Sequence, residues 1–487
     1  MESGVINLKK KINSILDYCA LALYLYVILS VFLPIFHTGH TEFFGLMALL
    51  VKIATLGIAG LKILLSFKDN IRFSLISILA LALSFGIYFF KYYTDVNSYL
   101  SVGTEIFDLV AVIVALHGIS TRRVLRDYII VRGTCFVIAA VAAHLGIIVS
   151  RRDYLPNRPG VWDMGMTHHN MPSVAFLFLA LSWIVLIKDS KYRVAHYFVI
   201  LLIDIYLGVS TTSRTSMFTL GMGVVLLAVI AFIEKSKSGL SKLFISVVSK
   251  CALICPILMF VVSMGGAVFR NYYLYCGNTI EKGFFYNMTS RFATLSSDFA
   301  NHGIKLPWSR GEQTVPYNWV LGGDISTAYS DNLVQVLVIK YGIVFTLLFF
   351  GFLQYWAIKA YREKNYTDLV IIAVLCIFSV MEHHTVNYIY NPFYCLISTI
   401  ATDADQYSSR SISKTFRNKK ILWFWIAEAV AFVISIVCMM PVFSYQIQSG
   451  KLHDYFLVWI VFTVCLIFGA VKIVDFQYNT EEKMQIV

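Results

Sequence analysis

Arg214 stands among hydroxyl residues in the stretch GVSTTSRTSMF, at a turn between two long apolar runs. A guanidinium group presents a planar fork that matches phosphate and keeps its charge when water is removed. Arg291, in NMTSRFATLSSDF, and Arg158 offer further forks from other segments. Two such forks could clamp a pyrophosphate. If the runs cross a membrane, the alternative is that Arg214 extends to the outer lipid headgroups.

Three more polar stretches hold groups that could orient or deprotonate a hydroxyl. They are His168, His169 and Asn170 in MGMTHHNMPS, Asp331 and Asn332 in AYSDNLVQ, and Glu382, His383 and His384 in MEHHTVNY. The candidates for a base are Asp331, His169, Glu382 and His384. An imidazole could also bind phosphate or a sugar hydroxyl. The alternatives are that Asn170 and Asp331 cap helices and that the histidines are hydrated loop residues.

Motifs for nucleotides and metals are weak or absent in the sequence. Asp403-Ala-Asp405 matches a short acidic pattern of nucleotide-sugar transferases, but it stands alone in a loop. The sequence has no Walker loop, no Rossmann glycine fingerprint and no HExxH motif. Most of the nine cysteines lie inside apolar runs, which is typical of packing residues. We therefore expect no metal, no disulfide framework and no cofactor.

The elements that must position these residues are membrane helices. The chain of 487 residues is 58% hydrophobic and 14% charged, whereas ordinary globular chains are about 25% charged. Apolar runs of roughly 20 residues, enough to cross a bilayer as a helix, recur along nearly the whole length. A membrane β-barrel is excluded because the runs do not alternate. The sequence predicts an all-α polytopic membrane protein with about 12 to 14 transmembrane helices.

The apolar runs also predict how the chain is organised. The expected segments are 16–36, 43–65, 71–90, 102–119, 129–149, 171–187, 196–211, 215–233, 243–269, 332–358, 367–381, 387–401, 420–443 and 455–474. They divide into N-terminal helices (1–149), a core that includes the outer loops 150–170 and 270–331 (150–400), and C-terminal helices (401–487). Three lysines precede the first run, which is expected to remain as a signal anchor.

Basic residues in the short loops predict that the N-terminus lies inside. Almost every inside loop is then basic, so the net charge of +12 mostly reflects topology, and nucleic-acid binding is not expected. Seven arginines still fall on the outer side: Arg151, Arg152, Arg158, Arg214, Arg270, Arg291 and Arg310. The two outer loops are longer than the others, and such loops are usually functional or disordered. Trp308, Trp319 and many tyrosines favour order in the second loop.

Taken together, these residues resemble the Wzy-type polysaccharide polymerases, a group that includes the O-antigen ligases. The resemblance covers about residues 150 to 350. It is carried by His168-His169-Asn170 before a helix, Ser213-Arg214 at an outer turn, Arg291 early in a large outer loop, and SDNLVQVLVIKYGI at the exit of that loop. Asp331 stands where the ligases commonly carry a histidine. The resemblance implies a GT-C-like glycosyltransferase with one large extracytoplasmic loop.

The resemblance also implies an activity. It is metal-independent polymerisation of oligosaccharides linked to polyprenyl (undecaprenyl) pyrophosphate, on the outer face of the cytoplasmic membrane. The growing glycan would be transferred to the non-reducing end of another lipid-linked unit. Arg214, Arg291 and Arg158 would bind the pyrophosphate, supported by His168, Asn170 and Asn332. A chain-length regulator could be a partner.

Two alternatives stay open. An O-antigen ligase would differ only in its acceptor. A flippase for lipid-linked oligosaccharides is the alternative of a different class, and Lys52 and Lys62 inside apolar runs favour it.

Overall fold

In the computed structural model the chain divides into two compact units, residues 1–405 and 406–487. All residues that the structure describes lie in the first unit. The described residues are 2–30, 41–67, 70–93, 105–148, 163–164, 166, 170–234, 236, 238–275, 332–382, 385 and 389–395. They form helices and turns, with no strand among them. The predicted segments 420–443 and 455–474 lie outside the described residues.

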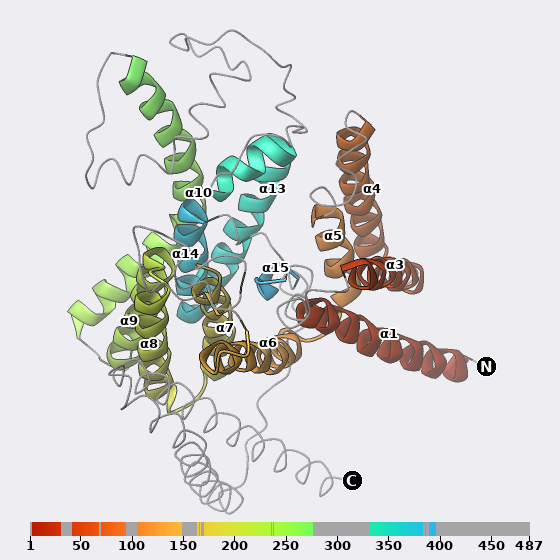
Figure 1. The fold of residues 1–487 in the computed structure, drawn as a ribbon, viewed down its shortest axis with the longest axis horizontal. Helices are drawn as coiled ribbons and strands as arrows, with labels where there is room; N and C mark the ends of the chain where they lie inside the picture. The colour runs from red at the N-terminus through yellow and green to blue at the C-terminus, as the bar shows by residue number, and fades with distance from the viewer. Residues whose placement is uncertain are drawn as a thin grey trace, which may run out of the picture. The chain divides into compact units, whose positions relative to one another are not determined.

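The first unit is a succession of helices (Figure 1). Their bounds are α1 Glu2–Ser30, α3 Thr41–Ser66, α4 Ile71–Tyr93, α5 Glu105–Leu116, α6 Thr121–His144, α7 Met171–Ile187, α8 Arg193–Ser210, α9 Arg214–Ile233, α10 Gly239–Tyr275, α13 Leu333–Arg362, α14 Tyr366–Met381 and α15 Pro392–Cys395. Each predicted segment from 16–36 to 367–381 overlaps one helix. The predicted starts at residues 16 and 129 are wrong, because α1 and α6 both begin earlier in the chain. Helix α6 begins at Thr121, where Arg122 and Arg126 stay exposed while Val124 and Leu125 are buried.

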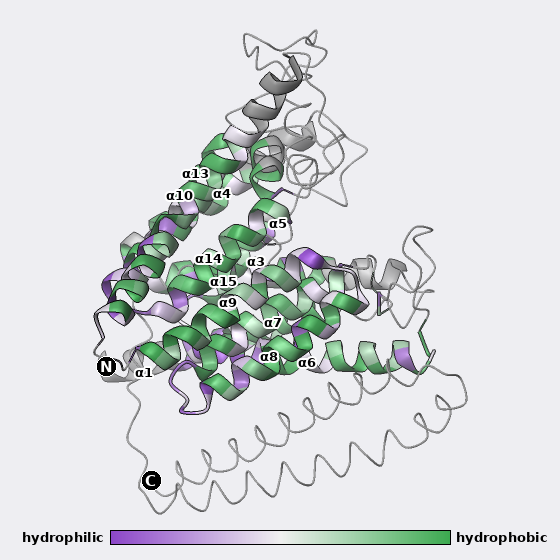
Figure 2. Cartoon of the chain, turned by 90° about the vertical axis from the view of Figure 1, so that its left-hand side faces the viewer, coloured by the Kyte–Doolittle hydropathy of each residue, from purple (hydrophilic) through white to green (hydrophobic). Residues whose placement is uncertain are grey.

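The composition of the helices indicates a multi-pass membrane protein. Six spans in the described part are long and apolar enough to cross a membrane: Lys11–Leu29, Leu49–Ser66, Arg193–Ser210, Arg214–Ile233, Gly239–Gly266 and Gly342–Arg362. Figure 2 shows hydrophobic residues along the helices and hydrophilic ones mainly at their ends. Large apolar side chains such as Phe218 and Phe232 are 68% and 72% exposed. Lipid is the environment that accepts such side chains without cost.

Helices α9 and α14 form a close antiparallel pair in the second half of this unit. A Cβ atom added to Gly223 would collide with the Val374 side chain, so the two backbones approach closely there. Toward the end of α9, Ile230 shares a pocket lining with Asn365 at the start of α14. The end of one helix therefore lies beside the start of the other. Small residues permit such close helix contacts in membranes.

Gly223→Ala is expected to destabilise the protein by about 1–3 kcal/mol, because the added methyl group overpacks the α9–α14 interface and faces a β-branched side chain. Thermal unfolding in detergent measures this effect. The double variant Gly223→Ala, Val374→Ala removes the obstructing methyl groups, so it should recover part of the loss. If the single variant unfolds like the wild-type protein, the close approach at Gly223 is wrong.

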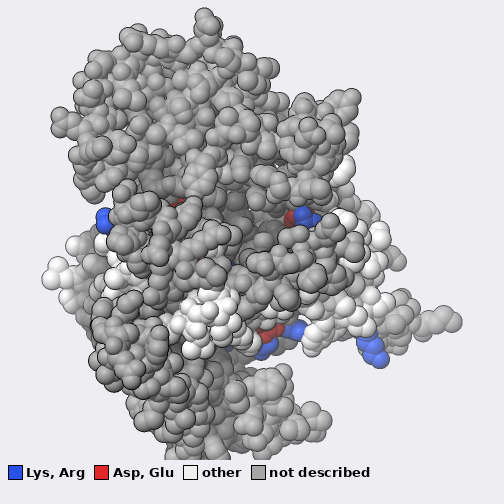
Figure 3. Space-filling view, in the orientation of Figure 1, with Lys and Arg blue, Asp and Glu red and all other residues white. Residues whose placement is uncertain are grey.

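Two lysines inside apolar helices form ion pairs between helices. The Lys52 ammonium lies 2.8 Å from Asp108 of α5. The Lys62 ammonium lies 2.6 Å from Asp17 of α1 and donates to the His117 carbonyl oxygen at 2.8 Å. On the face drawn in Figure 3, some basic and acidic atoms of described residues lie next to one another and other basic atoms stand alone. The two lysines thus join α1, α3 and α5. Lysines inside apolar runs favoured a flippase, and their pairing with carboxylates gives them a structural role instead.

Candidate functional site

The turn that carries Arg214 is strained and polar. Helix α8 ends at Ser210 and α9 begins at Arg214, which is exposed. Between them Thr212 has a φ of 54°, an outlier for a β-branched residue. Its hydroxyl oxygen is buried and has no hydrogen-bond partner among the described residues. Strain of this kind is concentrated at ligand-binding and active sites, so it supports a functional reading of the turn.

The same turn contacts the start of α7, which places two of the predicted stretches together. The hydroxyl oxygens of Ser173 and Thr211 lie 2.7 Å apart, and Thr211 donates to the Leu207 carbonyl oxygen. Asn170 occupies the N-cap position of α7 but makes no side-chain cap hydrogen bond, so the proposed capping role is wrong for that side chain. The structure therefore brings the Asn170 stretch and the Arg214 stretch side by side.

Glu382 lies at the same end of the bundle as Arg214. It follows the last residue of α14, has extended backbone, and is only 3% exposed. From the Gly223–Val374 contact, Arg214 is about 13 Å away along α9 and Glu382 about 12 Å away along α14, at about 1.5 Å per residue. Because these helices are antiparallel, the two residues reach similar levels. Helix α7 joins them there, since Phe178 packs edge-on against Phe378 of α14 at 5.9 Å.

Asn332 is fully buried at the start of α13. Its side-chain amide donates to the Ser263 hydroxyl of α10 at 3.2 Å. Helix α13 is interrupted at Gly342, whose φ of 79° and ψ of 171° are not helical, and only glycine adopts such a conformation readily. The break separates the short first part of α13, which follows Asn332, from the long part, where Gln354 donates to a carbonyl oxygen of α10 and Trp356 donates to a carboxylate of α14. The predicted continuous segment 332–358 is therefore wrong at this point.

The other predicted site residues lie outside the described part of the chain. They are Arg158, His168, His169, Arg291, Asp331 and His384. Three of them directly adjoin described residues, since His169 precedes Asn170, Asp331 precedes Asn332, and His384 precedes Thr385. These three residues are therefore next in the chain to residues described above. The roles of all six stay predictions.

A buried connection between α14 and α15 extends the site beyond the predicted residues. We use this name for the described residues Glu382, Thr385 and Ile389–Asn391, of which Ile389 and Tyr390 are half-buried and the others are buried. The Asn391 amide donates to the Thr385 carbonyl oxygen at 2.8 Å, and its oxygen accepts from the Phe393 N–H at 3.1 Å. Non-helical backbone inside a membrane protein needs such internal partners. The predicted start of a segment at residue 387 is wrong, because α15 begins at Pro392.

Sequence reasoning missed Arg132 of α6, which is only 1% exposed. Its guanidinium carbon lies 4.6 Å from the ring centroid of Tyr390 in the buried connection. One helical turn earlier, the Tyr128 hydroxyl donates to the Tyr390 carbonyl oxygen at 2.5 Å. Helix α6 thus holds Tyr390 by both its ring and its backbone. The signal was a charged residue inside the apolar run IIVRGTCFVIAA, which is costly in a membrane and is usually functional.

Tyr390→Leu is expected to destabilise the protein by about 2 kcal/mol more than Tyr390→Phe, because phenylalanine keeps an aromatic face for Arg132 and leucine does not. The Tyr128 hydrogen bond is retained in both variants, since it ends on the backbone. Chemical or thermal unfolding of the two variants in one detergent compares them directly. Equal stabilities would show that the ring face contributes nothing.

This arrangement provides a cation, hydroxyl groups and a buried carboxyl group at one end of a helix bundle. Among the described residues, no group of three His, Cys, Asp or Glu side chains could hold a metal ion. Comparisons of the chain with protein-family models, curated protein sequences and solved structures found no match. The functional reading therefore depends on the residues themselves.

Proposed function

We propose that this chain is a membrane glycosyltransferase that polymerises oligosaccharide units linked to polyprenyl pyrophosphate. The observation that carries the proposal is that Arg214 at the start of α9 and the buried Glu382 after α14 lie at the same end of one antiparallel pair. A cation and a carboxyl group at neighbouring helix ends suit a reaction in which an anionic group leaves while a hydroxyl attacks. The proposed architecture is GT-C-like.

The start of α9 suits the departing pyrophosphate. The positive end of the helix dipole and a guanidinium fork both favour an anion there. Ser213 occupies the N-cap position, and its hydroxyl oxygen lies 3.1 Å from that of Ser216, so its side chain does not cap the first turn of α9. Pyrophosphate is already a good leaving group. The site therefore chiefly needs fixed positive charge, and no metal is required for this step.

The acceptor hydroxyl needs orientation and a base. Of the four predicted base candidates, Glu382 lies within the described residues, and its burial places it where water does not compete for the hydroxyl. The other candidates, Asp331, His169 and His384, stand next in the chain to buried or helix-end residues. Arg291 and Arg158 are the proposed second and third cations for the pyrophosphate.

The proposed location of the reaction is the outer face of the cytoplasmic membrane. The opposite ends of α7, α9 and α14 meet Lys188, Arg193 and Lys364, and basic ends are expected inside the cell. The partners are lipid-linked oligosaccharides and the bilayer, and a chain-length regulator is a further candidate.

Purified protein incubated with a lipid-linked repeat unit tests the proposal. The reaction contains no ATP, nucleotide sugar or added metal, and glycan length is followed on a gel. A ladder is expected. Its absence, together with transport of the same lipid across a vesicle membrane, would overturn the enzyme in favour of a flippase. Transfer of the glycan only to an added acceptor that carries no polyprenyl pyrophosphate would favour the ligase.

A further inference from the structure

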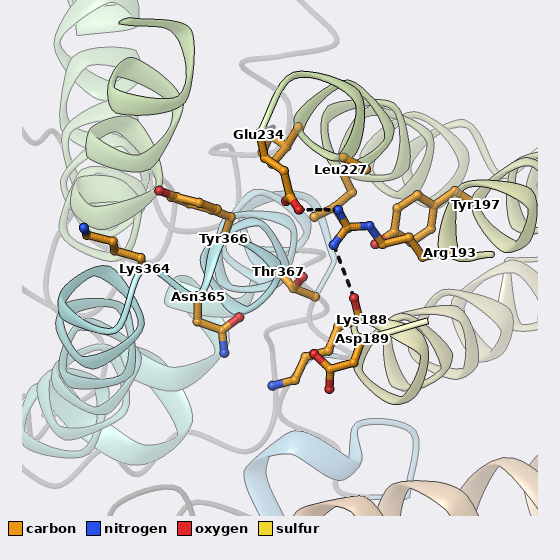
Figure 4. A pocket seen from close by; sticks show the side chains of 12 residues that line it. Lys188, Asp189, Arg193, Tyr197, Leu227, Glu234, Lys364, Asn365, Tyr366 and Thr367 are labelled. Atoms are coloured by element: carbon orange, nitrogen blue, oxygen red, sulfur yellow. Dashed lines mark hydrogen bonds and ion pairs between the residues drawn. The ribbon is translucent and has the colours of Figure 1, made fainter. Parts of the chain in front are cut away.

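A second polar site lies at the other end of the same helices. A half-open cavity of about 260 Å³ is lined by the α7–α8 connection, the start of α8, the end of α9 and the start of α14 (Figure 4). One side is apolar and is formed by Leu227, Ile230 and Ala231 of α9. The remaining lining is polar or charged. The site is remote from Arg214, since α9 separates Arg214 from Ile230 by about 24 Å.

The charges that line this cavity favour an anion. Three lining residues are basic, Lys188, Arg193 and Lys364, whereas two are acidic, Asp189 and Glu234. Glu234 is occupied, because its carboxylate lies 2.6 Å from the Arg193 guanidinium. Arg193 also donates to the Lys188 carbonyl oxygen at 3.3 Å, which fixes the α7–α8 connection. One net positive charge remains on the lining.

Lys188 is the cation best placed to reach a ligand. In Figure 4 its side chain extends toward Asn365, while that of Lys364 points away from Arg193. Lys188 also interacts electrostatically with Asp368, whose carboxylate accepts from the Trp356 ring N–H at 3.2 Å. Asp368 does not line the cavity, so a bound anion would share Lys188 with it. Asp189 is the acidic residue at the cavity that opposes an anion.

The start of α14 adds a second source of positive potential. Asn365 caps the helix by accepting from the Asp368 N–H at 3.2 Å, and Tyr366 and Thr367 of the first turn line the cavity. The N-terminal end of a 16-residue helix favours phosphate groups, and Asp368 of the same first turn is the residue that reduces this effect. The cavity is smaller than the roughly 300–1,000 Å³ typical of sites for drug-sized ligands. This size suits a phosphate headgroup better than a nucleotide.

We propose that this cavity binds a phosphate anion, supplied by an anionic phospholipid headgroup or by a soluble phosphate compound. Lys188 and the start of α14 hold the phosphate. The apolar side formed by α9 accommodates the adjoining glycerol and chain when the source is a lipid. Basic pockets between membrane helices bind lipid headgroups in this way. The site is independent of the polymerase proposal, because it requires no reaction.

Titration of the detergent-solubilised full chain with phosphatidylglycerol, read by native mass spectrometry, tests the site. Lys188→Gln is expected to weaken binding about fivefold, the effect of roughly one lysine near a charged headgroup. Asp189→Asn should strengthen binding by about the same factor. Lys191→Gln is the matched control, because this exposed lysine of the same connection lies over the Tyr192 ring and does not line the cavity. Its affinity should not change.

The source of the phosphate is decided by competition. If excess inorganic phosphate displaces the lipid, a soluble phosphate compound is the source. If it does not, and phosphatidylcholine binds more weakly than phosphatidylglycerol, the source is an anionic lipid. Equal losses in Lys188→Gln and Lys191→Gln would overturn the site, because binding would then reflect diffuse charge. Unchanged binding in Lys188→Gln would also overturn it.

Discussion

Arg214→Ala is expected to lower the rate of glycan lengthening by about 100-fold or more, the cost of removing one donor to a developing negative charge. Arg214 is exposed at the first position of α9, so its loss removes a fork from an anion without opening a cavity. Arg214→Lys keeps the charge but loses the planar fork, and its rate should fall between the other two. Initial rates with a lipid-linked repeat unit measure all three proteins.

The matched control for this prediction is Arg362→Ala. Arg362 lies in the last turn of α13 and is also exposed, and it has no place in the proposed site. Its loss should leave the rate within about twofold of wild type, an effect below about 0.5 kcal/mol. Full activity in Arg214→Ala would support the alternative in which this side chain only extends to lipid headgroups.

Arg291→Ala is predicted to have an effect similar to that of Arg214→Ala, if both residues hold the same pyrophosphate. Residues that act as a unit are strongly non-additive. The double variant should therefore be little slower than either single variant. Multiplying effects would instead indicate that the two arginines act on different groups.

The helices could be predicted from the sequence because the bilayer sets their length. The segment 171–187 coincides with α7, and 367–381 differs from α14 by one residue at its start. Boundaries failed where polar side chains stay exposed on a continuing helix, as at Arg122 and Arg126 of α6. The break at Gly342 was also missed. A lone glycine in an apolar run carries no signal of its φ, which tertiary packing decides.

The site could be predicted only as a set of separate stretches. The order of the predicted segments was enough to assign Asn170, Arg214 and Glu382 to one side of the membrane, because an even number of segments separates them. The contacts that join them, such as Ser173 with Thr211, are non-local and depend on which helices pack together. Arg132 was missed for a different reason. It lies inside a run that was read as a plain span, although a charge at such a position is itself a signal.

Glu382→Gln is expected to reduce the maximal rate by about 100-fold or more, within the range that positioned acids and bases contribute. The variant keeps the size of the side chain but replaces one acceptor oxygen with an NH2 donor. The Glu382 N–H donates to the Phe378 carbonyl oxygen at 2.8 Å, and this backbone bond is retained. The ability to accept a proton is lost, and any change in stability is a separate effect. Rates at saturating acceptor, beside thermal unfolding, separate the two effects.

A structural role and a role as base predict different results. A base gives a rate that falls as acid protonates it, so the wild-type rate should decline at low pH and the residual rate of Glu382→Gln should not. Glu382→Asp keeps a carboxylate but withdraws it by about one methylene, and it should recover part of the activity. If Glu382→Gln is fully active, Glu382 is not the base. Asp331, His169 and His384 are then the remaining candidates, and Asp331→Asn is the variant that distinguishes a base beside Asn332 from one in the two histidine stretches.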